Sequence, residues 1–164
     1  MRQISRHFST TFIVLVLSFL VSACGFHLRG QLPLPEAVSV IYLDAERSDF
    51  QRELQDSLRA AGANLVDQPS QAKAILQIVD EYAEREALTL NTDGRATAYK
   101  LYYTVEYVVA NEKQELLREG TLVEQSQYNF SSGQAVRQEN EEAELLEEMY
   151  KELSLKLVRQ LGSL

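Results

Sequence analysis

The amino-acid sequence predicts an α+β fold: a two-layer sandwich in which two helices pack on one face of a mostly antiparallel four-stranded sheet. Three observations predict it. A run with strand-like alternation occupies the middle of the chain, segments with helical spacing of apolar residues lie before and after it, and the length suits one compact domain. The expected order of elements is strand, helix, three strands, helix.

The beginning of the chain has the layout of a cleaved export signal. Two arginines precede an almost wholly apolar run, residues 12–21, and small residues stand just before Cys24. This run holds about ten residues, whereas a membrane-spanning helix needs roughly 20. The sequence therefore predicts a signal peptide over residues 1–23.

Cys24 is the only cysteine of the chain, so a disulfide within the chain is excluded. With His27 as the single histidine after it, Cys24 cannot build the usual four-ligand zinc site, and we expect no metal and no dissociable cofactor. Residues 21–24, VSAC, resemble the lipobox of bacterial lipoproteins, which implies a diacylglyceryl group and an N-acyl chain on Cys24. Each buried methylene contributes roughly 0.8 kcal/mol, so such chains would anchor the protein to a membrane. The alternative is an unmodified thiol in an ordinary secreted protein.

The mature chain would be strongly acidic. Removal of residues 1–23 leaves 14 basic and 24 acidic residues, a net charge of −10. Such a chain is a poor general binder of nucleic acid or of an anionic membrane surface, so an anionic ligand must meet a local basic cluster. We expect a lipidated tether over residues 24–37, which ends in the proline-bearing stretch QLPLPEA, and a single domain over residues 38–164.

The first half of the domain predicts a strand and a helix. Residues 38–43, VSVIYL, have the β-branched and aromatic content of a strand. Ser48 is placed to cap a helix with Gln51 three residues later, and Gly62 supplies the left-handed stop.

The second half predicts three strands and a last helix. Residues 74–90 form a strand with Leu76, Ile78 and Tyr82 on one face, and a turn follows at residues 91–95. Residues 99–109 show the clearest alternation of the sequence, with Lys100, Thr104 and Glu106 at even positions between odd apolar ones, which indicates one face in the core and one in water. The tyrosine-rich odd stripe is interpreted as core rather than as a ligand platform.

A third strand is expected over residues 116–130, with Gly120 indicating a bulge. A polar loop over residues 131–138 then leads to a helix with a continuous apolar stripe. The members of the stripe are Leu146, Met149, Tyr150, Leu153, Leu157 and Leu161.

Three segments of the chain resemble the LptE family of lipopolysaccharide-assembly lipoproteins. They are CGFHLRG after the lipobox, DGRATAYKLYYTV over residues 93–105, and NEEAELLEEMYKELSLKLVRQL over residues 140–161. The resemblance implies a non-enzymatic lipoprotein that partners LptD, sits in the lumen of that outer-membrane β-barrel as a plug, and assists delivery of lipopolysaccharide to the outer leaflet. The residue after Cys24 is Gly25 rather than an aspartate. In Gram-negative lipoproteins that resemble this one, the lack of an aspartate at this position favours passage to the outer membrane.

The resemblance also implies contacts between basic residues and lipopolysaccharide. The nearest residues here are Arg95 and Arg137, with Lys100 on the polar strand face as a third candidate. A guanidinium binds a phosphate bidentately, whereas the alternative is that each arginine only solvates a turn.

Two other classes of protein remain open. One is a different small outer-membrane lipoprotein that acts as a periplasmic binding or envelope-assembly module. The other is a hydrolase that uses a carboxylate pair such as Glu81 and Glu84, although nothing in the sequence fixes the separation of that pair.

Overall fold

The computed structural model describes residues 34–129 and 135–164, with side chains of the second range described from residue 140. The chain divides into two units, Met1–Gln31 and Leu32–Leu164, and all described residues belong to the second. The predicted signal peptide and most of the predicted tether lie outside the described residues. The last part of that tether belongs to the domain, because Leu34 packs against the core and Glu36–Val38 forms the 3₁₀ helix η1.

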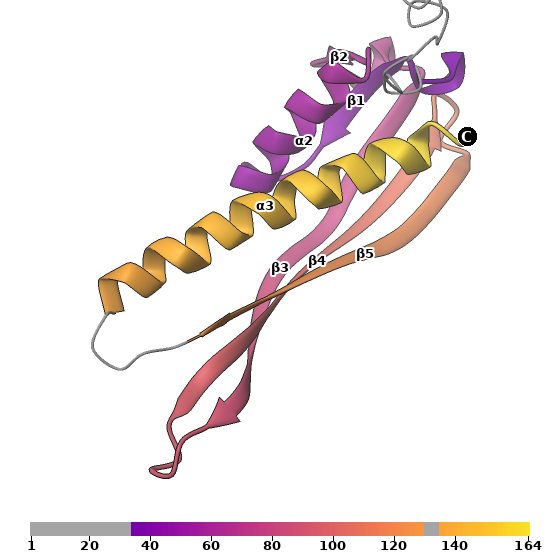
Figure 1. The fold of residues 1–164 in the computed structure, drawn as a ribbon. Helices are drawn as coiled ribbons and strands as arrows, with labels where there is room; N and C mark the ends of the chain where they lie inside the picture. The colour runs from indigo at the N-terminus through magenta and orange to yellow at the C-terminus, as the bar shows by residue number, and fades with distance from the viewer. Residues whose placement is uncertain (1–33, 130–134) are drawn as a thin grey trace, which may run out of the picture. The chain divides into compact units, whose positions relative to one another are not determined.

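The described domain contains one five-stranded sheet in the order β2-β1-β3-β4-β5. Both helices cover the same face of this sheet (Figure 1), as the apolar stripes of the sequence predict. The elements in chain order are β1 (Val40–Asp44), α2 (Asp49–Ala60), β2 (Asn64–Val66), the 3₁₀ helix η2 (Pro69–Gln71), β3 (Ala74–Leu90), β4 (Ala96–Asn111), β5 (Leu116–Asn129) and α3 (Ala135–Leu161).

The α+β class and the two helices on one face are confirmed, but two details of the prediction are wrong. The sheet has a fifth strand, β2, whose three residues are too few to show a period of two. The sheet is also mixed, because β1 pairs in parallel with both β2 and β3 while only the β3–β4 and β4–β5 pairs are antiparallel. The helix α2 makes the parallel pairing of β1 with β2 possible, since a parallel connection needs a crossover.

The predicted ends of α2 are confirmed. The Ser48 hydroxyl accepts a hydrogen bond from the Gln51 backbone N–H at 2.9 Å, which satisfies one of the free donors of the first turn. Gly62, two residues after the helix, has a φ of +88°, a value that favours glycine. The helix buries its apolar face completely at Phe50, Leu54 and Leu58.

The helix α3 begins at Ala135, so the prediction of a loop up to residue 138 is wrong. The apolar stripe of α3 packs as predicted. Met149, Leu153, Leu157 and Leu161 are buried, and Tyr150 packs against the core as a half-buried residue. The ring of Tyr150 lies 4.7 Å from that of Tyr103 on β4, in an edge-to-face arrangement.

Burial confirms the core face of β4, although Thr104 on the opposite face is buried as well. The odd residues Leu101, Tyr103, Val105, Tyr107 and Val109 are buried under the helices. Tyr103 and Tyr107 are therefore core residues and Tyr99 packs against the core, as predicted, whereas Tyr102 lies on the opposite face.

Shifts in strand register change the direction of side chains elsewhere in the sheet. The register of β3 on β4 shifts between Ile78 and Asp80, so Ile78 faces the helices while Tyr82 pairs with Thr104 on the opposite face. The prediction that Tyr82 shares a face with Leu76 is therefore wrong. The bulge expected at Gly120 is also absent, because Gly120 pairs in register with Tyr107 and the shift in the β4–β5 ladder occurs between Val109 and Ala110.

Candidate functional site

Three residues that the sequence analysis names fall where the structure describes no side chain. Cys24, the predicted lipid attachment site, and His27 lie outside the described residues. Arg137 lies in the first turn of α3, and its side chain is likewise outside the described part.

Arg95 lies in the turn that joins β3 to β4. The Asn91 side chain accepts backbone N–H hydrogen bonds from Asp93 at 3.0 Å and from Arg95 at 2.8 Å, and Gly94 has a φ of +75°. The last residue pair between β4 and β5 is Ala98 with Asn129. Arg95 therefore projects from a two-stranded tip that extends past the end of β5, and it is exposed.

Lys100 lies on the face of the sheet that no helix covers. It pairs directly with Glu86 across β3 and β4, and its Nζ atom lies 5.2 Å from the centre of the Tyr102 ring. The Tyr102 hydroxyl donates to Glu86 Oε2 at 3.4 Å. Because its direct strand partner is acidic, Lys100 offers a weaker net positive charge to a phosphate than an isolated lysine would.

The three predicted lipopolysaccharide residues lie on separate elements of the described chain. The turn with Arg95 and the start of α3 with Arg137 lie at the same end of the domain (Figure 1), on separate elements. Lys100 belongs to the sheet face opposite the one that α3 covers. We therefore treat Arg95 and Arg137 as one candidate region and Lys100 as another.

A polar cluster that the sequence analysis did not predict lies beneath the first half of α3. It consists of Arg85 on β3, Tyr99 on β4, Tyr128 on β5 and Glu142 on α3, and we call it the Arg85 cluster. Arg85 Nη1 lies 3.3 Å from Glu142 Oε2 and 3.5 Å from the Tyr128 hydroxyl, and the guanidinium lies 4.8 Å from the centre of the Tyr99 ring. The Tyr128 hydroxyl donates to Glu142 Oε2 at 2.6 Å.

The Arg85 cluster ties the early turns of α3 to three strands at once. Burial and the hydrogen bond to Glu142 raise the pKa of Tyr128, so its hydroxyl stays neutral and remains a donor at ordinary pH. The guanidinium already contacts a carboxylate, a hydroxyl and an aromatic ring, which indicates a structural role. The sequence offers little signal for this cluster, because Arg85 and Glu142 are far apart in the chain and the bulge before Asp80 determines which face Arg85 occupies.

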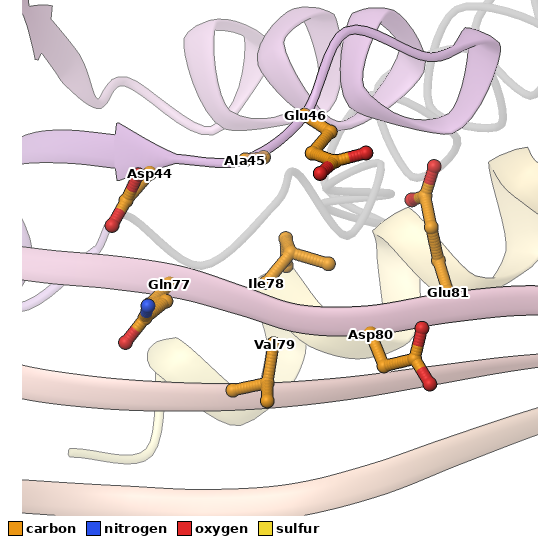
Figure 2. A pocket seen from close by; sticks show the side chains of 8 residues that line it. All are labelled: Asp44, Ala45, Glu46, Gln77, Ile78, Val79, Asp80 and Glu81. Carbon is orange, nitrogen blue, oxygen red and sulfur yellow. The ribbon is translucent and has the colours of Figure 1, made fainter.

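An acidic notch lies where β1 ends and β3 continues with β4 as its only strand neighbour. Its volume is about 390 Å³, and Figure 2 shows Glu46 and Glu81 above β3, Asp80 below it, and Asp44 between the end of β1 and β3. Partial burial raises the pKa of Glu81 above its ordinary value, although hydrogen bonding to Ser48 and Tyr103 offsets part of the effect. Glu84, the suggested hydrolytic partner of Glu81, is exposed and pairs with Tyr102 on the uncovered face.

Neither a metal site nor a spanning helix is found in the described part. Among residues 34–129 and 140–164, no group of three or more His, Cys, Asp and Glu side chains is arranged to hold a metal ion. The described helices also include none with the length and apolar character needed to cross a membrane.

The uncovered face of the sheet has an apolar centre. Tyr82, Thr104 and Val123 form one row across β3, β4 and β5, and Tyr102 lies in the next row. We call this surface, together with the acidic residues around it, the open face. The acidic residues are Asp44, Asp80, Glu84, Glu86, Glu106 and Glu119.

A sequence model of the LptE family, described as lipopolysaccharide-assembly, matches residues 36–161. The LPS-assembly lipoprotein LptE of Pectobacterium atrosepticum is 28% identical over 98 residues, which are 57% of this chain and 53% of that protein. The alignment thus spans about half the length of that relative. The LPS-assembly lipoprotein LptE of Photorhabdus laumondii is 22% identical over 158 residues, 95% of this chain and 86% of that protein.

Solved structures of bacterial lipoproteins share the fold. The uncharacterized lipoprotein B of Nitrosomonas europaea is 25% identical with a TM-score of 0.71, and the match covers 85% of this chain and 91% of that one. The rare lipoprotein B of Shewanella oneidensis has a TM-score of 0.67 at 21% identity, over 76% of this chain and 94% of that one. The minor lipoprotein of Acinetobacter baumannii has a TM-score of 0.66 at 19% identity, over 80% of this chain and 94% of that one.

Proposed function

The chain belongs to the LptE family, and we propose that it is an outer-membrane lipoprotein that partners an LptD-type β-barrel, plugs the barrel lumen and assists lipopolysaccharide assembly at the cell surface. One observation carries the proposal: the family match runs from the first residue of η1 to the last residue of α3, and so includes every described element. Family membership supports the role in lipopolysaccharide assembly. The barrel partnership, the plug and the outer-membrane location are our extension of it.

The partnership is tested with the full chain in its native host. We expect a barrel of the LptD kind to purify with the lipidated protein in mild detergent, at a fixed stoichiometry that survives size-exclusion chromatography. Recovery of the lipoprotein with a different envelope protein, and without that barrel, would favour the alternative of a different envelope-assembly module.

Lipid attachment at Cys24 is the second part of the proposal. The small residues before Cys24 and the apolar run before them motivate it. Mass spectrometry of the mature N-terminus should find a diacylglyceryl group and an N-acyl chain on Cys24. The Cys24→Ala variant should be unprocessed or mislocalised, and an unmodified thiol in the native protein would contradict the anchor.

Lipopolysaccharide binding through Arg95 and Arg137 is the third part. The domain is acidic overall, so attraction for a phosphorylated glycolipid must come from cations held at one place. Arg95 suits this role because it is exposed on a tip that a constrained turn holds away from the sheet. Lys100, beside Glu86, is proposed only as an auxiliary contact.

Charge reversal tests this part of the proposal. The Arg95→Glu/Arg137→Glu double variant should bind lipopolysaccharide more weakly than the parent at matched salt, with unchanged thermal stability, because exposed charges contribute little to folding. The Lys113→Glu/Lys151→Glu variant makes the same change in net charge at two exposed lysines elsewhere. If the two double variants bind lipopolysaccharide with equal affinity, Arg95 and Arg137 are not specific contacts. The Lys100→Glu variant tests the third residue separately.

A further inference from the structure

The open face combines exposed apolar side chains with one deeply buried polar residue. Thr104 retains only 7% of its surface although no helix lies over it, because its strand neighbours Tyr82 and Val123 flank it. Those two neighbours remain 39% and 51% exposed. Val79, at the bulge, points to the same side as Asp80 (Figure 2) and is also exposed.

The charges around this centre are almost all of one sign. Six acidic residues lie on the open face, and Lys100 is the only basic residue among the paired strand positions that face the same way. Glu84 and Glu106 are exposed, and neither forms an ion pair within the described residues. An apolar centre with a polar margin is the anatomy of a protein interface, and the sign of the margin restricts what can dock there.

The charge excludes two kinds of occupant. A phosphorylated glycolipid would bring negative groups against six carboxylates, so the open face is a poor surface for it. A second copy of this chain would bring an identical acidic margin, and like charges facing each other across an interface oppose association. The favoured occupant is a protein surface with lysine and arginine side chains around an apolar patch.

We propose that the open face is the docking surface for such a basic surface on the barrel partner. This inference rests on the proposed function and refines it, because it names the face of the domain that makes the charge-selected contact with the barrel. The covered face is occupied by α2 and α3, and the tip with Arg95 stays available for phosphate groups. Protein docking and lipid contact would then use different surfaces of one small domain.

Charge reversal on the open face provides the test. The Glu84→Lys/Glu106→Lys variant of the full chain is produced with its LptD-type barrel in the native host, and the complex is purified in mild detergent at low salt. We expect at least about a tenfold loss of the barrel recovered per lipoprotein, because two attractive margin charges become repulsive. Salt should weaken the parent complex more than the remaining complex of the variant.

A matched variant separates this effect from a general effect of charge. Glu148 and Glu152 are exposed on α3, so Glu148→Lys/Glu152→Lys changes the net charge by the same amount without touching the open face. It should recover the barrel as the parent does. Loss of barrel in both variants, or in neither, would overturn the inference while the barrel partnership stands. Failure of the parent itself to recover the barrel would instead overturn the proposed function.

The apolar centre is tested separately. Tyr82→Ser and Val123→Ser should each lower recovery of the barrel several-fold while the circular dichroism melting curve stays close to that of the parent, because both side chains are substantially exposed. Sedimentation of the purified parent checks the rival occupant. A dimer that Val123→Ser dissociates would assign the open face to a second copy and overturn the proposal.

Discussion

The two ends of β3 lie in different environments although they belong to one strand. Near β1, Leu76 is fully buried and Ala74 almost fully so. Beyond Glu81, every residue from 82 to 90 is exposed, and Leu90 retains 63% of its surface. The difference lies in what accompanies the strand, since β1 pairs with β3 only up to Gln77 and leaves β4 as its only strand neighbour farther on.

This comparison teaches that alternation in a sequence predicts which side chains share a face, but not whether anything covers that face. We call residues 74–78 the inner part of β3 and residues 82–90 the outer part. The inner part shares its core with α2 and the later turns of α3. The outer part has exposed side chains, and its surface is the one that offers contacts to other molecules.

The largest expected effect is the difference in stability loss between truncating a core residue and truncating a residue in the outer part of β3. Leu153 on α3 is fully buried, so Leu153→Ala should lower the free energy of unfolding by about 2–5 kcal/mol through lost burial and a cavity. Leu90→Ala removes the same atoms from an exposed position and should change it by less than about 0.5 kcal/mol. Urea denaturation of both variants measures the contrast, and similar losses would mean that the outer part is as well covered as the core.

The second prediction concerns the close approach of β5 to β4 in the core. A Cβ atom added to Gly120 would lie 3.1 Å from the hydroxyl oxygen and 3.2 Å from a ring carbon of Tyr107. The ring has little room to move, because Tyr107 is buried and its hydroxyl donates to Gln160 on α3. Gly120→Ala should therefore destabilise the domain by about 1–3 kcal/mol.

The Gly120 substitution has its own control within the same strand. Ser126→Ala makes a small change at a residue of β5 that also faces the helices, and it adds no Cβ atom because serine already has one. An unchanged midpoint for Gly120→Ala in thermal denaturation would mean that Tyr107 shifts freely, and the packing described for this pair would then be wrong.

Much of the fold could be predicted because local rules decide it. The ends of α2 follow from Ser48, Gln51 and Gly62, and the limits of β3 follow from its β-rich composition between two turns. Three-residue β2 could not be predicted, because a strand so short has no pattern of its own and owes its pairing to β1.

The candidate sites depend on register, which the sequence did not reveal. A single extra residue near Val79 moves Tyr82 to the open face and brings Arg85 beneath α3. The neighbours of Lys100 likewise follow from pairing with Glu86. The basic residues of the candidate sites could be predicted from the sequence. The side chains that surround each of them could not, because they depend on how the strands pair in three dimensions.

The third prediction sharpens the comparison within α3. The Arg85 cluster holds the early turns of α3, while buried leucines hold the later ones. Arg85→Ala should increase amide hydrogen exchange around Glu142 and leave exchange around Leu157 unchanged, since local opening follows local contacts. The Arg85–Glu142 coupling in a double-mutant cycle should be about 0.2–1 kcal/mol, because the pair is partly exposed. Faster exchange along the whole helix would contradict a local role for the cluster.

The smallest expected effect is a pH dependence at the boundary between the two parts of β3. Partial burial raises the pKa of Glu81 in the folded domain above its ordinary value near 4.5. The folded state therefore binds a proton more tightly than the unfolded chain does, so this contribution to stability is fully present below the unfolded pKa and is lost as the pH rises through the folded value. Glu81→Gln replaces the carboxylate with a neutral group of similar shape and removes this dependence. The variant should gain stability relative to the parent as the pH rises through that window.

Urea denaturation across acidic to neutral pH measures the difference between parent and variant. Glu84 serves as the control, because it is exposed in the outer part of the same strand, and Glu84→Gln should leave the pH profile as in the parent. A difference between parent and Glu81→Gln that stays constant over the whole range would mean that Glu81 ionises alike in the folded and unfolded chain. A profile altered equally by both substitutions would mean that the general charge of the domain, rather than partial burial at the end of β1, governs its response to pH.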